Sequence, residues 1–143
     1  MVDPGTAVGV ISLGLQVLQG LATFYKHFAS FHNELSTVVR RIESLHMIID
    51  ALEGPVRDLE RDDLISAAVR QCIETCKAGI EELEVYQKKC GSVTLVTTVK
   101  KNKLRASKSR LLFPFRKATL DDLAKALDRL QSNLDTVALA LQL

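Results

Sequence analysis

The pattern of apolar and polar positions predicts an all-α protein organised around one uncharged stretch. Residues 4–25 carry no charged side chain. As a helix that rises about 1.5 Å per residue, this stretch would be roughly 33 Å long, enough to cross the hydrocarbon core of a bilayer. Its polar positions recur at helical spacing and form one polar stripe, made of Ser12, Gln16, Gln19 and Thr23. Such a segment can be the buried helix of a bundle, enter a membrane, or do each at a different time.

The first helix is expected to open at Asp3 and Pro4 and to run to about His27 or Phe28. An aspartate side chain can accept hydrogen bonds from the free N–H groups of a first turn, and a proline at the first helical position has no N–H to leave unpaired.

A second helix is predicted after the capping residues of segment 30–33. Gly54 and Pro55 are expected to end it, with residues 56–61 as a connector. Its apolar positions follow the i, i+3, i+4, i+7 spacing of an amphipathic helix: Leu35, Val38, Val39, Ile42, Leu45, Ile49 and Leu52.

A third helix is predicted to begin at Asp62 or Asp63 and to end near Gly91. Its apolar positions are Leu64, Ala68, Cys72, Ile73, Cys76, Ile80, Leu83 and Tyr86. Residues 92–99 are rich in β-branched side chains, which favour a strand. Because a lone strand has no partner in this chain, we expect a loop or an extension of the helix instead.

Residues 100–110 are basic and predicted to be a mobile loop, and residues 111–115 an apolar anchor interrupted by Pro114. Thr119 to Asp122 read as a capping box for a fourth helix. Its apolar positions are Leu120, Leu123, Leu127, Leu130, Leu134, Val137 and Leu141.

Together these patterns predict one domain, residues 1–143, that forms a four-helix bundle with a central apolar N-terminal helix and a basic loop before the last helix. The chain also ends inside a helical pattern, as expected of the N-terminal part of a longer protein.

Charge is distributed unevenly along the chain. The net charge is +2, but residues 85–120 contain ten Lys or Arg residues and no Asp or Glu, which leaves −8 on the remainder. One strongly basic segment is therefore expected on an acidic body.

The sequence contains no pattern typical of an enzyme, a cofactor site or a metal site. It has no phosphate-binding loop, no HExxH and no CxxC, and its three histidines, His27, His32 and His46, are scattered. Three cysteines without a paired framework favour a reducing intracellular setting, with Cys72 and Cys76 as buried apolar residues of a helix. We therefore expect a non-enzymatic protein located in the cytoplasm.

The two ends of the chain resemble the N-terminal domains of fungal NOD-like (STAND) receptors, the HeLo-like domains related to SesA. The resemblance covers essentially the whole chain. It rests on Asp3-Pro4-Gly5 with Val8-Gly9-Val10-Ile11-Ser12-Leu13-Gly14-Leu15-Gln16, and on Phe113-Pro114-Phe115 with Thr119-Leu120 and the leucine-rich last helix. These domains are similar in architecture to the four-helix domain of the mixed-lineage-kinase-like necroptosis executioner and to the coiled-coil domains of plant resistance proteins.

The resemblance implies an innate-immunity domain that executes regulated cell death by attacking membranes. A downstream nucleotide-binding domain of the full-length receptor would activate it through oligomerisation, and the domain would then move from the cytoplasm to the plasma membrane or another membrane. The family pattern places the membrane-inserting helix at residues 4–25. Its apolar candidates are Val8, Val10, Ile11, Leu13, Leu15, Val17, Leu18, Leu21 and Phe24.

The basic segment is the candidate contact for anionic lipids, each charge near the surface contributing roughly 1 kcal/mol. Its candidate residues are Lys100, Lys101, Lys103, Arg105, Lys108 and Arg110. Two alternatives remain open from the sequence: a non-lytic adaptor bundle that binds other proteins, and unspecific, salt-sensitive binding of nucleic acid by this segment. No specific nucleic-acid partner is expected, because the segment lacks interleaved aromatic residues and a recognition-helix pattern.

Overall fold

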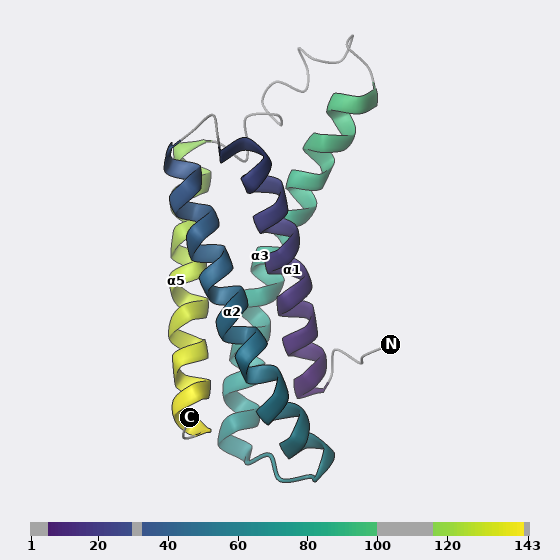
Figure 1. Cartoon of the computed structure of the whole chain (residues 1–143), viewed down its shortest axis with the longest axis vertical. Coiled ribbons are helices and arrows are strands. Elements are labelled where there is room, and N and C mark those ends of the chain that lie inside the picture. The colour runs from purple at the N-terminus through teal and green to yellow at the C-terminus, as the bar shows by residue number, and fades with distance from the viewer. Residues whose placement is uncertain (1–5, 30–32, 100–115, 142–143) are drawn as a thin grey trace.

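Helices dominate the computed structural model, which describes residues 6–29, 33–99 and 116–141, with side chains described for 6–29, 34–89 and 116–141. In these ranges the chain forms α1 (Ala7–Phe28), α2 (Asn33–Arg61), α3 (Ala67–Val99) and α5 (Lys117–Ala140) and has no strand (Figure 1). The predicted all-α four-helix bundle with an apolar N-terminal helix is confirmed. The predicted basic loop and the apolar anchor at 111–115 lie outside the described residues.

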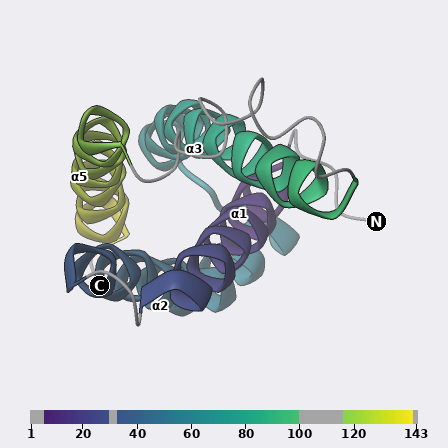
Figure 2. The ribbon, with the colours of Figure 1, turned by 90° about the horizontal axis from the view of Figure 1, so that it is seen from above.

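Each helix packs mainly against two others. α1 packs most extensively against α2 and also against α3, whereas α5 packs against α3 and, less extensively, against α2. Viewed along the bundle, α1 therefore lies between α2 and α3, with α5 on the opposite side (Figure 2). α1 occupies a corner of the bundle and is not a central helix enclosed by the other three. The C-terminal part of α3 extends beyond the end of the bundle (Figure 1).

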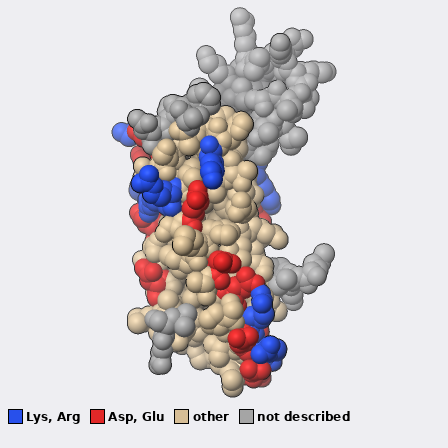
Figure 3. Space-filling view, in the orientation of Figure 1, with Lys and Arg blue, Asp and Glu red and all other residues tan. Residues whose placement is uncertain are grey.

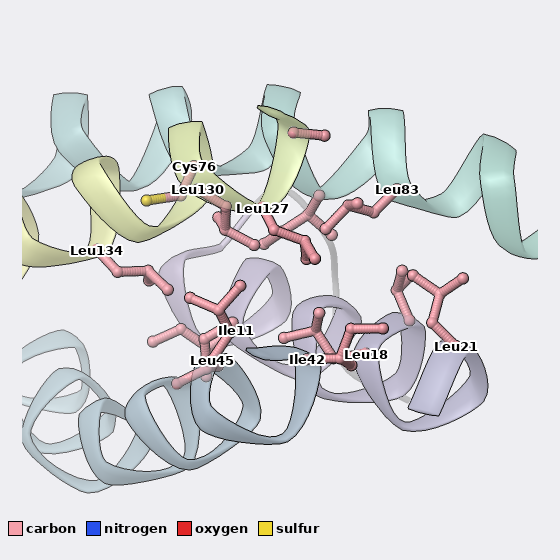
Figure 4. Packing of buried hydrophobic residues seen from close by; sticks show 14 of the residues in the cluster. Ile11, Leu18, Leu21, Ile42, Leu45, Cys76, Leu83, Leu127, Leu130 and Leu134 are labelled. Atoms are coloured by element: carbon pink, nitrogen blue, oxygen red, sulfur yellow. The ribbon is translucent and has the colours of Figure 1, made fainter. Parts of the chain in front are cut away.

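All four helices contribute apolar side chains to one core (Figure 4). Leu18, Leu21 and Tyr25 of α1 are fully buried. The core is closely packed, since the gap where Ile11, Ile80 and other apolar side chains meet has a volume of only about 10 Å³. The remaining fully buried large side chains come from the other helices: Leu35, Ile42, Leu45, Ile49, Ile80, Leu83, Leu123, Leu127 and Leu130.

The predicted end of the second helix at Gly54 and Pro55 is wrong. α2 continues through Pro55 to Arg61, so residues 56–61 are helical and not a connector. Leu52 and Val56 are 3% and 0% exposed, which shows that the apolar face carries on past the proline. Burying such side chains is worth about 1.5–3 kcal/mol each, enough to offset an interior proline that costs about 3 kcal/mol.

Both predicted ends of the third helix are wrong as well. α3 begins at Ala67, where the Ser66 hydroxyl accepts a hydrogen bond from Val69 N at 3.2 Å, whereas Asp63 lies in the preceding turn with φ 54°. Leu64 and Ala68, predicted for the apolar face, are exposed. At the other end the helix passes Gly91 and reaches Val99, so residues 92–99 extend it. Of the two alternatives for that segment, helix extension is confirmed.

The predicted caps of the first and last helices also differ from the structure. α1 is capped by Thr6, whose hydroxyl accepts from Gly9 N at 3.0 Å, while Asp3 and Pro4 lie outside the described residues. α5 begins at Lys117 after Arg116, which makes no capping side-chain hydrogen bond. Thr119 is therefore a buried residue of the first turn and not the cap of a capping box.

Candidate membrane-active helix

The nine apolar residues predicted to insert into the membrane lie on the buried face of α1 and along the two edges of that face. Five are buried: Val10, Ile11, Val17, Leu18 and Leu21. The other four are partly buried and pack at the edge of the core: Val8, Leu13, Leu15 and Phe24. In the folded bundle none of the nine is fully exposed, because they are used to hold α1 against α2 and α3.

The polar stripe of α1 faces solvent. Gln16, Gln19 and Thr23 are exposed and Ser12 is partly exposed. The Gln19 amide donates to the Thr23 hydroxyl at 3.3 Å, so these side chains satisfy part of their hydrogen-bonding capacity within the helix. Lys26, in the last turn, is the only Lys, Arg, Asp or Glu of α1. Figure 3 shows a broad area without Lys, Arg, Asp or Glu in the middle of this face.

Two glycines allow α1 to approach its neighbours closely. A Cβ atom on Gly14 would lie 3.0 Å from Ile80 Cδ1 of α3 and 3.1 Å from Ile49 Cδ1 of α2. A Cβ atom on Gly20 would lie 1.8 Å from Nε2 and 3.4 Å from Cγ of Gln87. The absent side chains at these positions leave the space that α2 and α3 fill.

A carboxylate from α2 holds the N-terminus of α1. Glu60 accepts hydrogen bonds from Ala7 N at 2.8 Å (Oε2) and from Val8 N at 3.2 Å (Oε1). With the Thr6 hydroxyl on Gly9 N, three N–H groups of the first turn have side-chain acceptors. A negative charge at this position also interacts favourably with the helix dipole.

A groove lies between the C-terminal half of α1 and α2. Its volume is about 510 Å³, and its lining includes Gln19 and Thr23 of the polar stripe. Met47 of α2 projects into it and is 71% exposed, which is unusual for a large apolar side chain. The remaining lining residues are Ala22, Lys26, His27, Glu43 and His46.

The described residues supply little chemistry beyond packing and hydrogen bonding. They contain no group of three or more His, Cys, Asp or Glu that could hold a metal ion. Cys76 is buried and Cys72 is partly buried, close to the prediction for this pair. Burial, with a smaller contribution from Cys72, raises the pKa of the Cys76 thiol to about 12, so this thiol is protonated at neutral pH.

By length and composition, α1 is the one helix of the described chain that could cross a membrane. A window of its 22 residues has a mean hydropathy of 1.6, and 44% of that window is buried. The buried helix of a soluble protein meets the same criterion. The six candidate lipid-binding residues, Lys100, Lys101, Lys103, Arg105, Lys108 and Arg110, lie outside the described residues.

Sequence reasoning missed Glu60 and Thr6. The predicted helix end at Gly54 and Pro55 places Glu60 in a connector. The spacing of Leu52, Val56 and Leu59 continues the apolar phase of α2 and would have indicated that the helix goes on. No sequence pattern indicated that residue 60 contacts residues more than 50 positions earlier.

Comparison with known proteins finds a curated relative that aligns with most of the chain. The chain is 33% identical over 132 residues to the azaphilone pigments biosynthesis cluster protein L of Monascus ruber. The aligned region covers 90% of this chain and 27% of that protein, so the chain spans about a quarter of the length of this curated relative. The name of the relative refers to a biosynthesis cluster and states no activity. No protein-family model and no solved structure matches the chain.

Proposed function

We propose that this chain is a regulated cell-death effector domain that oligomerises and permeabilises membranes through α1. The observation that carries the proposal is the solvent-facing side of α1, which has no Lys, Arg, Asp or Glu before Lys26. α2, α3 and α5 carry many such residues on their outer sides. A corner helix of a soluble bundle does not need an uncharged outer face, but a helix that enters lipid does, because a charge at the bilayer centre costs about 2.5–3.5 kcal/mol or more.

The polar stripe gives a reason for oligomerisation. Polar side chains inside a membrane face other helices or water. Ser12, Gln16, Gln19 and Thr23 follow one side of α1, so several copies could bring their stripes together around a wet lumen or in helix–helix contacts. The resemblance to HeLo-like domains supports the same assembly, triggered in the full-length protein by a nucleotide-binding domain.

The proposed partners are anionic membrane lipids and further copies of the chain. The basic residues of segment 100–110 would hold the domain on an anionic surface while α1 enters the bilayer. The resting protein would be cytoplasmic and would move to the plasma membrane or another cell membrane on activation. Because α1 contributes Leu18, Leu21 and Tyr25 to the core, its departure requires a trigger.

A reversible cross-link tests whether α1 must leave the bundle. Gly20→Cys combined with Gln87→Cys places a sulfur near the Gln87 Cγ position, 3.4 Å from the Cβ position of residue 20, within reach of a disulfide. The native cysteines are removed first, by Cys72→Ser, Cys76→Ala and Cys90→Ser. Dye release is measured from phosphatidylserine vesicles, cardiolipin vesicles and neutral vesicles, with the chain artificially clustered.

The oxidised and reduced forms are the same molecule, so each controls for the folding of the other. We expect the reduced form to release dye from anionic vesicles and the oxidised form to release little. Equal release by both forms would show that α1 does not need to separate from α3, and would overturn the proposed mechanism.

The groove with its exposed Met47 favours a second function, a non-lytic adaptor bundle that binds another protein. Exposed methionines are adaptable contacts at binding surfaces. This function predicts no dye release from any vesicle by either form, clustered or not.

A further inference from the structure

We propose that Glu60 is an autoinhibitory clamp that keeps α1 docked in the resting bundle, an inference that rests on the proposed function of α1. The clamp consists of the Glu60 carboxylate and the two backbone N–H groups that donate hydrogen bonds to it. The donor–acceptor distance is 2.8 Å from Ala7 N and 3.2 Å from Val8 N. Hydrogen bonds to a charged acceptor are roughly twice as strong as those between neutral groups. One side chain thus fixes the first turn of the helix proposed to leave.

The position of Glu60 within α2 is not explained by α2 itself. The residue lies in the last turn, where the carbonyl end of the helix dipole disfavours a negative charge. In the described part of the chain, Glu60 forms no ion pair, and the neighbouring Arg61 pairs with Asp58 and Asp62 instead. The favourable electrostatic partner of Glu60 is the N-terminus of α1, where the dipole has the opposite sign.

The continuation of α2 beyond Pro55 brings Glu60 to this place. Val56 is 0% exposed and anchors the extra turns in the core. Had α2 ended at Gly54, no part of it would reach the first turn of α1 as Glu60 does.

Release of the clamp would leave the N–H groups of Ala7 and Val8 without their acceptor and would remove the charge that favours the docked helix. The first turn of α1 would then open more often, while the packing around Leu18 and Leu21 stays intact. A trigger that displaces or neutralises Glu60 would thereby lower the barrier to the departure of α1.

Glu60→Ala and Glu60→Gln test the clamp in the full 143-residue chain. Glu60→Ala removes both acceptor oxygens, and Glu60→Gln keeps one neutral oxygen. Asp58→Asn is the matched control, because it removes the same charge from the same end of α2, and the exposed Asp58 side chain pairs with Arg61 of its own helix. Amide hydrogen exchange of Ala7, Val8 and Gly9 is measured by NMR, together with dye release from anionic vesicles.

We expect exchange at Ala7 and Val8 to be about tenfold faster in Glu60→Ala, less so in Glu60→Gln, and unchanged in Asp58→Asn. Core amides of α3 and α5 should keep their protection, and dye release should be faster in both Glu60 variants. Unchanged exchange in α1, or an equal acceleration throughout the chain, overturns the clamp. If exchange rises in α1 alone but neither the wild type nor any variant releases dye, the clamp on α1 stands and the proposed membrane function fails.

Discussion

Ile80 Cδ1 lies 3.0 Å from the position that a Cβ atom would take on Gly14, closer than ordinary van der Waals contact. Ile80 is 2% exposed and has little room to move. We therefore expect Gly14→Ala to lower the free energy of unfolding by about 1 kcal/mol, since overpacking of about 1–3 kcal/mol exceeds the helix propensity of about 1 kcal/mol that alanine adds. Urea denaturation followed by circular dichroism measures the change.

Gly79→Ala is the control for this prediction, because a Cβ atom on Gly79, inside α3, would lie 3.8 Å from Leu130 Cδ1, an ordinary van der Waals contact. Here no neighbour has to move and the helix propensity improves, so the free energy of unfolding should rise by about 1 kcal/mol. Equal stabilisation by both substitutions would contradict the close contact between α1 and α3.

Pro55→Ala should stabilise the protein, because Pro55 lies inside α2 and removes one helical hydrogen bond. We expect an increase of up to about 3 kcal/mol in the free energy of unfolding, measured by the same denaturation experiment. A decrease would contradict the expectation that Pro55 weakens the helix around it.

Because its thiol is buried, Cys76 is expected to make the folded protein less stable at alkaline pH. Its pKa is about 12 in the folded protein, against a reference value of 9.0, because burial disfavours the thiolate. The folded state therefore holds the proton more tightly, and this contribution to stability is complete below pH 9 and is lost as the pH rises from 9 to 12.

The measurement is the free energy of unfolding between pH 7 and 12 for the chain and for Cys76→Ala, both with Cys90→Ser. The two curves should draw together above pH 9, as the wild-type thiol loses its advantage. Curves that stay parallel would contradict the buried, protonated thiol.

Reversal of three charges in the basic segment should weaken binding to anionic vesicles. Lys100→Glu, Lys101→Glu and Lys103→Glu together remove attraction of roughly 1 kcal/mol per charge near the surface and add repulsion. We expect the affinity for phosphatidylserine vesicles, measured by co-sedimentation, to fall at least a hundredfold. The affinity for neutral vesicles should not change.

The matched control reverses three exposed charges of the described helices: Arg40→Glu, Arg70→Glu and Lys125→Glu. Both triple variants change the net charge by the same amount. Because Arg40, Arg70 and Lys125 form no ion pair within the described chain, we expect their reversal to have little effect on folding. Equal loss of binding in both triple variants would mean that net charge, and not this segment, attracts the lipid.

The helices and most of the core followed from periodicity, because Ile42, Leu45, Leu127 and Leu130 repeat at the spacing that one buried face requires. The ends of helices were less predictable, because they depend on tertiary contacts. Burial of Val56 outweighs Pro55 locally, and the cap at Thr6 replaces the one expected at Asp3.

The candidate site was predictable only in part. The polar stripe could be read from the spacing of Gln16, Gln19 and Thr23, and the structure places it in solvent. Glu60 could not be identified, because its contact with Ala7 joins positions 53 residues apart. Sequence spacing reports which residues share a face of one helix, but not which helix end a distant side chain reaches.

The packing order of the helices determines how α2, α3 and α5 would be held together if α1 left the bundle. α2 and α3 do not pack extensively against each other, so α1 bridges them on one side and α5 on the other. Without α1, α2 would be attached to the α3–α5 pair only by its smaller interface with α5, the Arg41–Asp128 ion pair and the short turn at residues 62–66. In the proposed activation, departure of α1 would therefore also let α2 move relative to α3 and α5, so two helices and not one would change position.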